Sequence, residues 1–358
     1  MFHKEAKAAS AAGFDVSYVV HDPPAEHDSI VKFHSLGTSQ SRMQRWSHLP
    51  RTYRIAQSLD SDIYHFHDPE LLPVGILLQT TTDASVIYDA HEDYGYNAIE
   101  YREWIPTAIR PSIARSFPKI QSAFANRLDM VITTTESIAK QFRELGHTNV
   151  EVIHNFPKTK NITISDSPVE QSKDITLVYV GSFEHIHGLI PMLQLVDELN
   201  QRDYEVELWM LGTFADDKNE ERAAQFIAQN NLSEAVQFFG RIPYEDIFPY
   251  LAEADIGLCL VDKERCEHAL PTKIFEYMYS KTPVLATDAH SIRPYVTDDV
   301  GRRVSQTNPS EQADAVLNLV SDDEQLEQMG EQGRSLVMQK YNWEQEAQRL
   351  IEIYNSLI

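Results

Sequence analysis

Short apolar segments alternate with longer amphipathic segments along most of the chain. A segment such as "ESIAKQFRELG" (136–146) has the length and the period of a helix. The alternation of short apolar runs with helical patterns predicts βαβ units and therefore parallel sheets. The predicted strands are 14–20, 62–68, 84–91, 129–135 and 149–155 in the first half, and 175–183, 204–212, 235–242, 255–261 and 282–288 in the second.

One polar stretch interrupts this alternation. Residues 156–174, "FPKTKNITISDSPVEQSKD", follow neither a helical nor a strand period, which predicts a linker. A chain of 358 residues is too long for one ordinary core and suffices for two. We therefore expect two α/β domains, at 1–156 and 175–340, with a linker at 157–174 and a final helix at 341–358.

The start of the chain has an unusual order of elements. "MFHKEAKAASAAG" (1–13) predicts an amphipathic helix that ends at Gly13, and a strand follows directly. A doubly wound domain normally opens with a strand and a glycine-rich turn before its first helix. We expect that this domain either has a different order or lacks roughly one strand and one turn, and the sequence favours the second.

Acidic residues outnumber basic ones by 54 to 31, which gives a net charge of −23. This charge argues against general nucleic-acid binding, which needs a basic surface. It suits a very salty cytosol, where salt screens self-repulsion, so a halophilic source is one hypothesis. Two cysteines, no signal-peptide pattern and no long apolar run indicate a cytosolic protein without a disulfide framework.

"ALPTKIFEYM" (269–278) places Lys273 in the first turn of a predicted helix, directly after Pro271. The helix dipole disfavours a cation at this end. The position makes sense if an anion such as phosphate lies between the ammonium group and the free N–H groups. Glu276 lies one turn further on the same face, where a carboxylate could accept hydrogen bonds from sugar hydroxyls. The alternative is a simple ion pair between Lys273 and Glu276.

A second candidate phosphate-binding element is "VYVGSFEHIHG" (178–188). An apolar strand leads into Gly181, and Gly188 opens a helix after a short turn. Glycine lets an anion approach the backbone N–H groups closely. Such turns are common in α/β proteins, so this motif gains weight only together with the Lys273 segment.

Polar residues gather at the ends of two predicted strands of the first domain, in "HFHDPELLPVG" (65–75) and "YDAHEDYGY" (88–96). Open α/β sheets bind ligands at this edge. A metal-dependent hydrolase that uses His65, His67 and His91 is one interpretation. The full set is His65, His67, Asp68, Asp89, His91, Glu92 and Asp93.

The N-terminal domain also has two locally basic windows, Arg42–Arg54 and 102–127. The second interleaves arginines and one lysine with isoleucine, phenylalanine and three prolines. It predicts either contact with an anionic membrane surface or ordinary packing beside a solvated basic rim.

These segments together resemble the retaining glycosyltransferases of family 4, and the resemblance covers nearly the whole chain. The segments that carry it occur in family order: "FHKEAKAASAAGFDV", "YHFHDPELLPVG", "VIYDAHEDY", "LDMVITTTESIAKQF", "VIHNFP", "VYVGSFEHIHG", "FFGRIPYEDIFPYLAEADIGL", "ALPTKIFEYMYSKTPVLATD" and "YNWEQEAQRLIEIY". The resemblance implies the GT-B fold, in which two Rossmann-like doubly wound domains face each other across a cleft. It also implies that the helix around Trp343 crosses back to the first domain, and that about 15 to 30 residues precede this version of the chain, enough for one strand and a turn.

The resemblance assigns roles by position. Lys273, with backbone near Leu270 and Thr272, would bind the donor diphosphate, and Glu276 would bind the ribose. Gly181 would begin the donor loop, Arg241 and Ile242 would border the nucleobase, and His91 would lie against the transferred sugar. On the acceptor side the candidates are His67, Asp68 and Glu92.

The chain departs from the family pattern in the donor loop and at one position before Glu276. Many members carry an arginine or lysine in the donor loop, where this chain has Ser182 and His187. Many members also carry a glutamate eight residues before Glu276, where this chain has His268. These departures leave the donor sugar open.

The resemblance implies a retaining, metal-independent transfer from a nucleotide-sugar to a saccharide or lipid-linked acceptor, as in polysaccharide or glycoprotein biosynthesis. No cofactor beyond the nucleotide-sugar substrate would be needed. The expected location is the cytoplasm, with peripheral contact at the inner face of the cell membrane through 102–127. A nucleotide-sugar epimerase and an inactive nucleotide-sugar-binding homologue are the alternatives within the same architecture.

Overall fold

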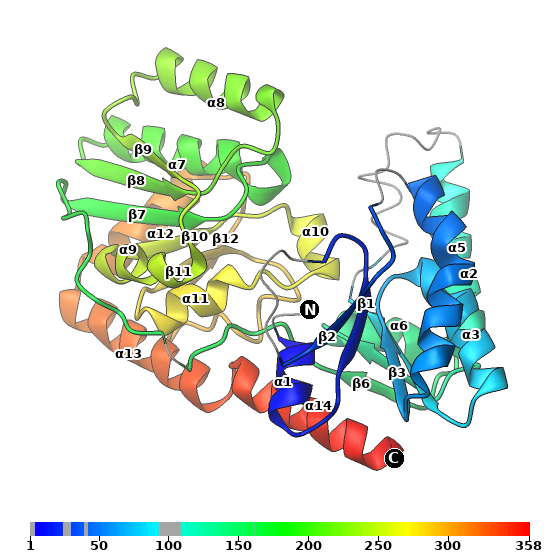
Figure 1. Ribbon diagram of the computed structural model, residues 1–358. Coiled ribbons are helices and arrows are strands. Elements are labelled where there is room, and N and C mark those ends of the chain that lie inside the picture. The colour runs from blue at the N-terminus through cyan, green and yellow to red at the C-terminus, as the bar shows by residue number, and fades with distance from the viewer. Residues whose placement is uncertain (1–3, 24–29, 39–41, 92, 94–108, 161) are drawn as a thin grey trace. The chain divides into compact units, whose positions relative to one another are not determined.

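The structure is a computed structural model that describes residues 4–23, 30–38, 42–91, 93, 109–160 and 162–358 (Figure 1). For residues 42, 43, 265 and 268 it describes the backbone alone. The chain divides into two compact units, and each is described by itself. The N-terminal unit comprises Met1–Asn155 with Trp343–Ile358, and the C-terminal unit comprises Phe156–Asn342.

The N-terminal unit is an α/β unit whose described strands form two parallel sheets. One sheet has the order β3-β4-β5-β6, and the other pairs β1 with β2. Its elements are α1 (Glu5–Ala11), β1 (Ser17–Val20), β2 (Lys32–Ser35), α2 (Arg42–Leu59), β3 (Ile63–Phe66), the 3-10 turn η1 (Pro69–Leu71), α3 (Leu72–Thr81), β4 (Ser85–Ala90), α5 (Arg110–Ala125), β5 (Met130–Thr133), α6 (Glu136–Glu144), β6 (Val150–Val152) and α14 (Trp343–Leu357).

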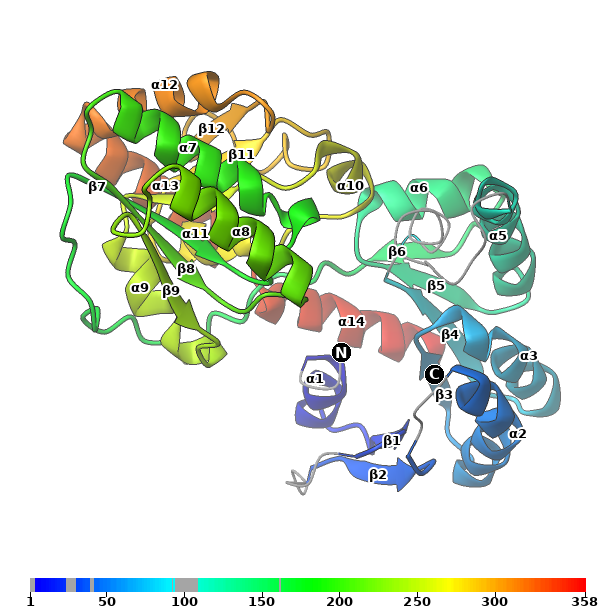
Figure 2. The same cartoon turned by 90° about the horizontal axis from the view of Figure 1, so that it is seen from above.

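Both faces of the four-stranded parallel sheet are covered by other elements. Successive side chains of a strand point to opposite faces, so apolar residues along one strand pack on both sides. On one face Ile87 and Ile132 pack with Leu350 and Tyr354 of α14. The neighbouring residue Tyr88 points the other way and packs with residues of α3, α5 and α6. Figure 2 shows α2, α3 and α5 along the sheet, with α1 and α14 on its other side. The residues that pack on both faces explain why the strands read as continuous apolar runs.

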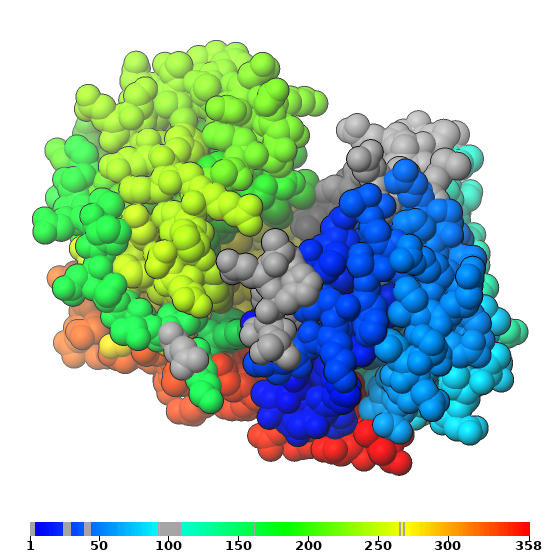
Figure 3. All heavy atoms as spheres, viewed as in Figure 1, coloured from blue at the N-terminus to red at the C-terminus, as the bar shows by residue number. Residues whose placement is uncertain are grey.

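Among the described residues, β1 pairs with β2 alone and β3 pairs with β4 alone. The facing edges of β1 and β3 are therefore not hydrogen-bonded to each other there. In the space-filling view the described residues of β1, β2 and α2 lie side by side as a blue surface (Figure 3). The predicted absence of a strand stays a prediction.

The C-terminal unit contains one parallel six-stranded sheet in the order β12-β11-β10-β7-β8-β9. Because β7 to β9 run outwards on one side and β10 to β12 on the other, the order reverses between β7 and β10. Its elements are β7 (Ile175–Val180), the 3-10 turn η2 (His185–His187), α7 (Leu189–Gln201), β8 (Val206–Leu211), α8 (Asp217–Gln229), β9 (Val236–Gly240), the 3-10 turn η3 (Tyr244–Asp246), α9 (Phe248–Glu253), β10 (Ile256–Cys259), α10 (Lys263–His268), α11 (Lys273–Tyr279), β11 (Val284–Thr287), β12 (Gly301–Val304), α12 (Pro309–Val320) and α13 (Asp323–Gln339).

Two apolar clusters sandwich this sheet. Leu177 and Tyr179 of β7 belong to the cluster that includes α7 and α12. Val178 faces the other cluster, together with Trp209 and residues of α9 and α11. The two clusters place α11 directly against the strands, which fixes the position of its first residue.

The α/β fold with parallel sheets predicted from the sequence is confirmed, and each predicted strand contains an observed one. The first helix also ends as predicted, with Gly13 at a φ of 98°. Two strands were not predicted. β2, with the sequence KFHS, is only partly buried, and β12, with the sequence GRRV, carries two adjacent arginines, so neither has an apolar run.

Candidate functional site

The donor-site candidates of the C-terminal unit meet where the strand order reverses. Gly181 follows β7 directly, and Lys273 begins α11, which follows β10. Lys273 Nζ lies 3.1 Å from the position that a Cβ on Gly181 would occupy. Open α/β sheets bind ligands at this point, beyond the carboxyl ends of the strands. The structure therefore brings together two residues that are 92 positions apart (273 − 181) and that the sequence proposes for one diphosphate.

Tyr179 holds the ammonium group of Lys273 in place. The Lys273 Nζ atom lies 3.9 Å from the centroid of the Tyr179 ring, within cation–π range. Burial raises the pKa of the Tyr179 hydroxyl, and the nearby charge of Lys273 opposes that shift. The hydroxyl donates a hydrogen bond of 2.8 Å to the carbonyl of Ser182. Tyr179 thus links the cation to the donor loop.

The donor loop, residues 181–188, is held by its own polar side chains. The Ser182 hydroxyl donates to Glu184 over 2.7 Å, and Nδ1 of His187 lies 3.2 Å from the carbonyl of Ser182. The same nitrogen lies 4.0 Å from the Glu184 carboxylate. Gly188 ends the loop with a φ of 85°, and a Cβ there would lie 2.0 Å from the carbonyl oxygen of Leu260. No other residue type fits that position.

The other donor-side candidates surround α11 and the end of β9. Glu276 is buried one turn beyond Lys273. Leu270 packs partly buried against the same core cluster as α11. Thr272 precedes the helix with helical backbone angles, and its side chain makes no capping hydrogen bond. The backbone of α10 is described at His268, but the side chain of His268 lies outside the described residues.

Arg241 and Ile242 follow β9 on a turn that Gly240 opens with a φ of 71°. The N–H of Gly212 donates to the Gly240 carbonyl over 2.8 Å, which holds this turn beside the end of β8. Arg241 is exposed and Ile242 is partly buried. Both therefore lie on the same edge of the sheet as Gly181.

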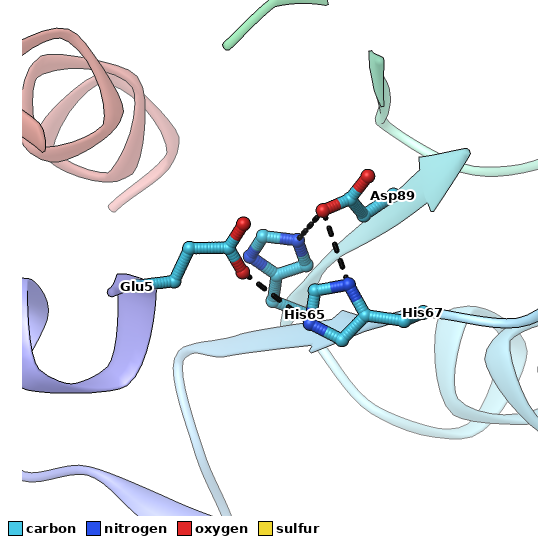
Figure 4. Close-up of side chains that lie close together, drawn as sticks. All are labelled: Glu5, His65, His67 and Asp89. Atoms are coloured by element: carbon cyan, nitrogen blue, oxygen red, sulfur yellow. Dashed lines mark ion pairs between the residues drawn. The ribbon is translucent and has the colours of Figure 1, made fainter. Parts of the chain in front are cut away.

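In the N-terminal unit, four ionisable side chains from three elements converge (Figure 4). Glu5 belongs to α1, His65 to β3 and Asp89 to β4, while His67 follows β3 directly. Asp89 Oδ2 lies 3.0 Å from His67 Nδ1 and 3.8 Å from His65 Nε2. Glu5 Oε2 lies 3.3 Å from His67 Nε2. The imidazole of His67 therefore has a carboxylate at each nitrogen.

Burial and mutual charge shift the pKa values of this cluster in opposite directions. Burial raises the pKa of Glu5. Burial also opposes ionisation of Asp89, but the adjacent imidazoles of His65 and His67 outweigh it and hold the pKa of Asp89 well below its usual value. Burial would lower the pKa of His67, yet the adjacent Asp89 carboxylate, with Glu5, raises it. The cluster therefore favours a charged Asp89 carboxylate in the interior of the N-terminal unit.

The remaining N-terminal candidates lie around a cavity of about 440 Å³ whose lining includes His67, Asp68 and His91. The rings of His67 and His91 stand edge to face, with centroids 5.7 Å apart. The His91 carbonyl accepts a hydrogen bond of 3.1 Å from Thr134. Asp93 accepts a hydrogen bond of 2.8 Å from Gln141 on α6. Glu92 lies outside the described residues.

Three residues of these sites were missed by the sequence reasoning. Glu5 lies in a helix that the pattern predicted, and its only signal is that it shares a buried face with Ala9, four residues on. Tyr179 and Glu184 lie inside the quoted donor-loop motif. In that motif the sequence singles out glycine as the chemical feature, and Tyr179 is only one residue of the apolar strand that leads into it.

The comparisons with known families cover nearly the whole chain. Residues 2–160 match the family described as Glycosyltransferase Family 4, and residues 160–336 match the family described as Glycosyl transferases group 1. The chain belongs to glycosyltransferase family 4. This membership confirms the family and the enzyme class predicted from the sequence.

Two curated relatives of this family 4 chain align with about half of its length. The D-inositol 3-phosphate glycosyltransferase of Corynebacterium urealyticum is 26% identical over 184 residues, which are 50% of this chain and 42% of the relative. That of Corynebacterium jeikeium is 28% identical over 185 residues, 50% of this chain and 43% of the relative. The matched segment therefore spans less than half of either relative.

Solved structures establish the GT-B fold. Sucrose-phosphate synthase from Thermosynechococcus elongatus superposes with a TM-score of 0.78 at 18% identity, covering 98% of this chain and 91% of that one. HepE of Anabaena, solved in complex with UDP, gives a TM-score of 0.71 at 15% identity, with coverages of 91% and 87%. A glycosyltransferase from Rickettsia africae gives 0.76 at 14% identity, with coverages of 98% and 92%.

The basic segment 102–127 of the family 4 chain is described from residue 109 onwards, mostly as α5. Ile109, Ile120 and Phe124 expose 49%, 55% and 39% of their surface. The exposed residues Arg115 and Lys119 lie on the same helix. None of the described helices is both long and apolar enough to span a bilayer.

Proposed function

We propose that the protein transfers a sugar from a nucleotide-sugar donor to a saccharide or lipid-linked acceptor, with retention of configuration and without a divalent metal on the donor. The observation that carries this proposal is the position of Lys273 Nζ beside the Gly181 turn. A diphosphate at that turn would meet an ammonium group where the strand order reverses. UDP is the first nucleotide to test, because HepE was solved with it.

In the proposed reaction, the bond between sugar C1 and the diphosphate oxygen breaks, and the leaving group gains negative charge. Lys273 would stabilise that charge, and removing one such contact typically costs about 3 kcal/mol. The acceptor hydroxyl would attack C1 from the face that the diphosphate leaves. Attack from this face retains the configuration at C1. The proton of the acceptor hydroxyl would pass to the departing phosphate oxygen, which balances the charges.

Glu276 and His91 have separate roles in this proposal. The buried carboxylate of Glu276, one turn beyond Lys273, would accept hydrogen bonds from the ribose hydroxyls. His91 would contact the transferred sugar, and His67 and Asp68, which line the same cavity, would contact the acceptor. His187 would take the place of a donor-loop cation when it is protonated next to the diphosphate, with Glu184 beside it.

The donor site can be tested by thermal shift with UDP, GDP and ADP in the presence of EDTA. We expect one nucleotide to raise the unfolding temperature, since a ligand at a hundred times its Kd stabilises the folded state by about 2.7 kcal/mol. Lys273→Ala should abolish the shift. Lys281→Ala, which removes an exposed lysine of the same unit paired with Glu331, should keep it. A shift of equal size in Lys273→Ala would refute the assignment.

Activity assays separate transfer from the alternatives. Transfer needs an acceptor, whereas an epimerase would convert the donor alone, and an inactive homologue would bind the nucleotide without turnover. A metal-dependent hydrolase would lose all activity with chelator. Family membership favours transfer.

The exposed apolar and basic residues of α5 support contact with an anionic membrane, where each basic residue contributes about 1 kcal/mol. Cosedimentation with phosphatidylglycerol vesicles, but not phosphatidylcholine vesicles, is the expected result. Phe124→Ser should weaken binding. Equal binding to both vesicle types would contradict an electrostatic contact.

A further inference from the structure

The strongest unexplained feature outside the proposed donor site is the cluster of Glu5, His65, His67 and Asp89 (Figure 4). Each residue offers one nitrogen or carboxylate oxygen, and these atoms all lie within 4.8 Å of one another. Asp89 exposes only 1% of its surface and Glu5 6%. Two carboxylates this deep need compensation, because an isolated buried charge is costly.

Compensation from the protein is incomplete. In the part of the chain that the structure describes, neither Glu5 nor Asp89 forms an ion pair with a lysine or arginine. His65 Nε2, His67 Nδ1 and Asp89 Oδ1 are buried and have no hydrogen-bond partner of good geometry among the described residues. Buried polar atoms in native proteins are nearly always satisfied, so three such atoms in one cluster point to a missing ligand.

The orientation of His65 suits a cation as that ligand in one of its two neutral tautomers. Its Nδ1 atom lies 2.6 Å from the Tyr354 hydroxyl, which uses this nitrogen. The other nitrogen, Nε2, faces the Asp89 carboxylate at 3.8 Å, too far for a hydrogen bond. When Nδ1 carries the proton, a lone pair faces a carboxylate, which is repulsive unless a cation lies between them. Metal-bound histidines are oriented in this way by a hydrogen bond at the second nitrogen.

We propose that Glu5, His65, His67 and Asp89 bind one divalent transition-metal ion of the zinc class. Imidazole and carboxylate together suit zinc, and four protein ligands make a closed, structural site. Zinc bonds of about 2.0–2.2 Å place tetrahedral ligands about 3.3–3.6 Å apart. The four candidate ligand atoms, one from each residue, lie within 4.8 Å of one another, so side-chain rotations that shorten the longer separations would complete the site.

The ion has a structural task that the topology makes clear. β1 and β3 are not paired with each other among the described residues, so α1 and the β1-β2 sheet are joined to the four-stranded sheet by side chains. Glu5 lies on α1 and the other ligands lie on β3, just after it and on β4. A bound zinc ion would therefore link α1 to the four-stranded sheet within the N-terminal unit. This role is separate from the donor diphosphate, and it leaves metal-independent transfer intact.

The first test is the metal content of the full chain, purified without a polyhistidine tag and measured by elemental analysis. We expect about one zinc ion per chain. After removal of zinc with chelator, Co²⁺ should give the visible absorption of a tetrahedral site, and added Zn²⁺ should abolish it. No zinc and no cobalt spectrum in the folded chain would overturn the proposal.

Variants connect the ion to its ligands. Glu5→Gln and His65→Ala should each weaken Zn²⁺ binding by at least tenfold in competition with a chromophoric chelator. His154→Ala is the matched control, because His154 Nδ1 also faces a buried carboxylate, Glu346, at 3.4 Å but lies outside the cluster. An equal loss of zinc in His154→Ala would refute the assignment. If His65→Ala does not fold, the cobalt spectrum of the unaltered chain and the zinc affinity of Glu5→Gln still test the proposed site.

The test is independent of the proposed function. UDP binding belongs to the C-terminal unit, so Glu5→Gln should keep the nucleotide-induced thermal shift while it loses zinc. Lys273→Ala should show the opposite pattern, with zinc kept and the shift lost.

Discussion

Two buried carboxylates, Glu207 in the C-terminal unit and Asp89 in the N-terminal unit, are satisfied in different ways. Glu207 on β8 accepts hydrogen bonds from the Ser172 N–H at 2.8 Å and from Thr176 and Gln237 at 3.1 Å. Asp89 faces two imidazoles and keeps one oxygen without a hydrogen bond. Neutral hydrogen-bond donors surround the Glu207 carboxylate, which is typical of a structural charge. The Asp89 carboxylate lies among histidines and lacks a hydrogen bond at one oxygen, which is what a ligand-binding carboxylate shows.

The two units also differ in how their sheets carry polar residues. In the C-terminal unit a continuous six-stranded sheet lies between two apolar clusters, and its polar chemistry is confined to the edge where Gly181 and Lys273 meet. In the N-terminal unit the polar cluster lies between α1 and the four-stranded sheet. The first arrangement suits rigid positioning of a phosphate, and the second depends on what binds between its parts.

The largest effect that we predict concerns this rigid edge. Lys273→Ala should lower the rate of sugar transfer by about 10²–10³-fold, since it removes a positioned charge from the leaving group. The fall should appear in kcat, extrapolated to saturating donor, in addition to the loss of nucleotide affinity that abolishes the thermal shift. A fall in donor affinity alone, with kcat unchanged, would mean that Lys273 binds the ground state and the transition state equally.

Gly188→Ala tests how tightly the C-terminal unit is packed. The new Cβ would lie 2.0 Å from the Leu260 carbonyl oxygen at a φ of 85°. We expect a loss of about 3 kcal/mol or more in the free energy of unfolding, measured with urea. Gly146→Ala in the N-terminal unit, at a φ of 94° with nothing within 4 Å, should cost only about 1–2 kcal/mol. Equal losses would mean that backbone strain outweighs the steric clash.

The sequence predicted the C-terminal unit more completely because its information is local. Each strand there except β12 lies in a largely apolar run, and Gly181 and Lys273 stand at the ends of predicted elements. Their meeting follows from the rule that ligands bind where the strand order reverses. Nothing local predicts that Tyr179 would lie under the ammonium group, since an aromatic residue at the end of a strand normally packs in the core.

The N-terminal cluster could be predicted only in part. His65, His67 and Asp89 lie at the ends of neighbouring parallel strands, so their proximity follows from strand order. Glu5 comes from a helix near the start of the chain, and a lone acid on an alanine-rich helix is usually solvated. Its burial depends on the packing of α1 against α14, where Ala9 contacts the cluster of Leu350 and Tyr354, which is a long-range contact.

Glu207→Gln tests whether the complete carboxylate shell is structural. The variant keeps the shape but weakens charge-assisted hydrogen bonds, which contribute about 1.5–3 kcal/mol each when the partner is charged. We expect a loss of roughly 2 kcal/mol in the free energy of unfolding with UDP binding unchanged. Gln237→Ala, which removes one donor to Glu207, should cost less. A Glu207→Gln chain that is as stable as the unaltered one would indicate that the charge of Glu207 adds nothing to the stability of this shell.

The smallest effect concerns the donor loop, where His187 replaces the cation that many family members carry. Nδ1 of His187 lies within 4.0 Å of the Glu184 carboxylate and 3.2 Å from the Ser182 carbonyl, so a permanent cation at this position would have acceptors in place. His187→Lys should therefore raise UDP affinity by about threefold to tenfold at low salt, and the gain should shrink as ionic strength rises. Isothermal titration at two salt concentrations measures both.

His185→Lys is the matched control, because it adds the same charge two residues away on an exposed position. A specific contact predicts a gain for His187→Lys alone, whereas a general change in potential predicts equal gains for both variants. If His187→Lys weakens binding, the histidine is needed as a neutral hydrogen-bonding group of the loop. In that case Lys273 would be left as the one cation that the described C-terminal residues bring to the diphosphate, and the rigid edge of this unit would depend on it more strongly.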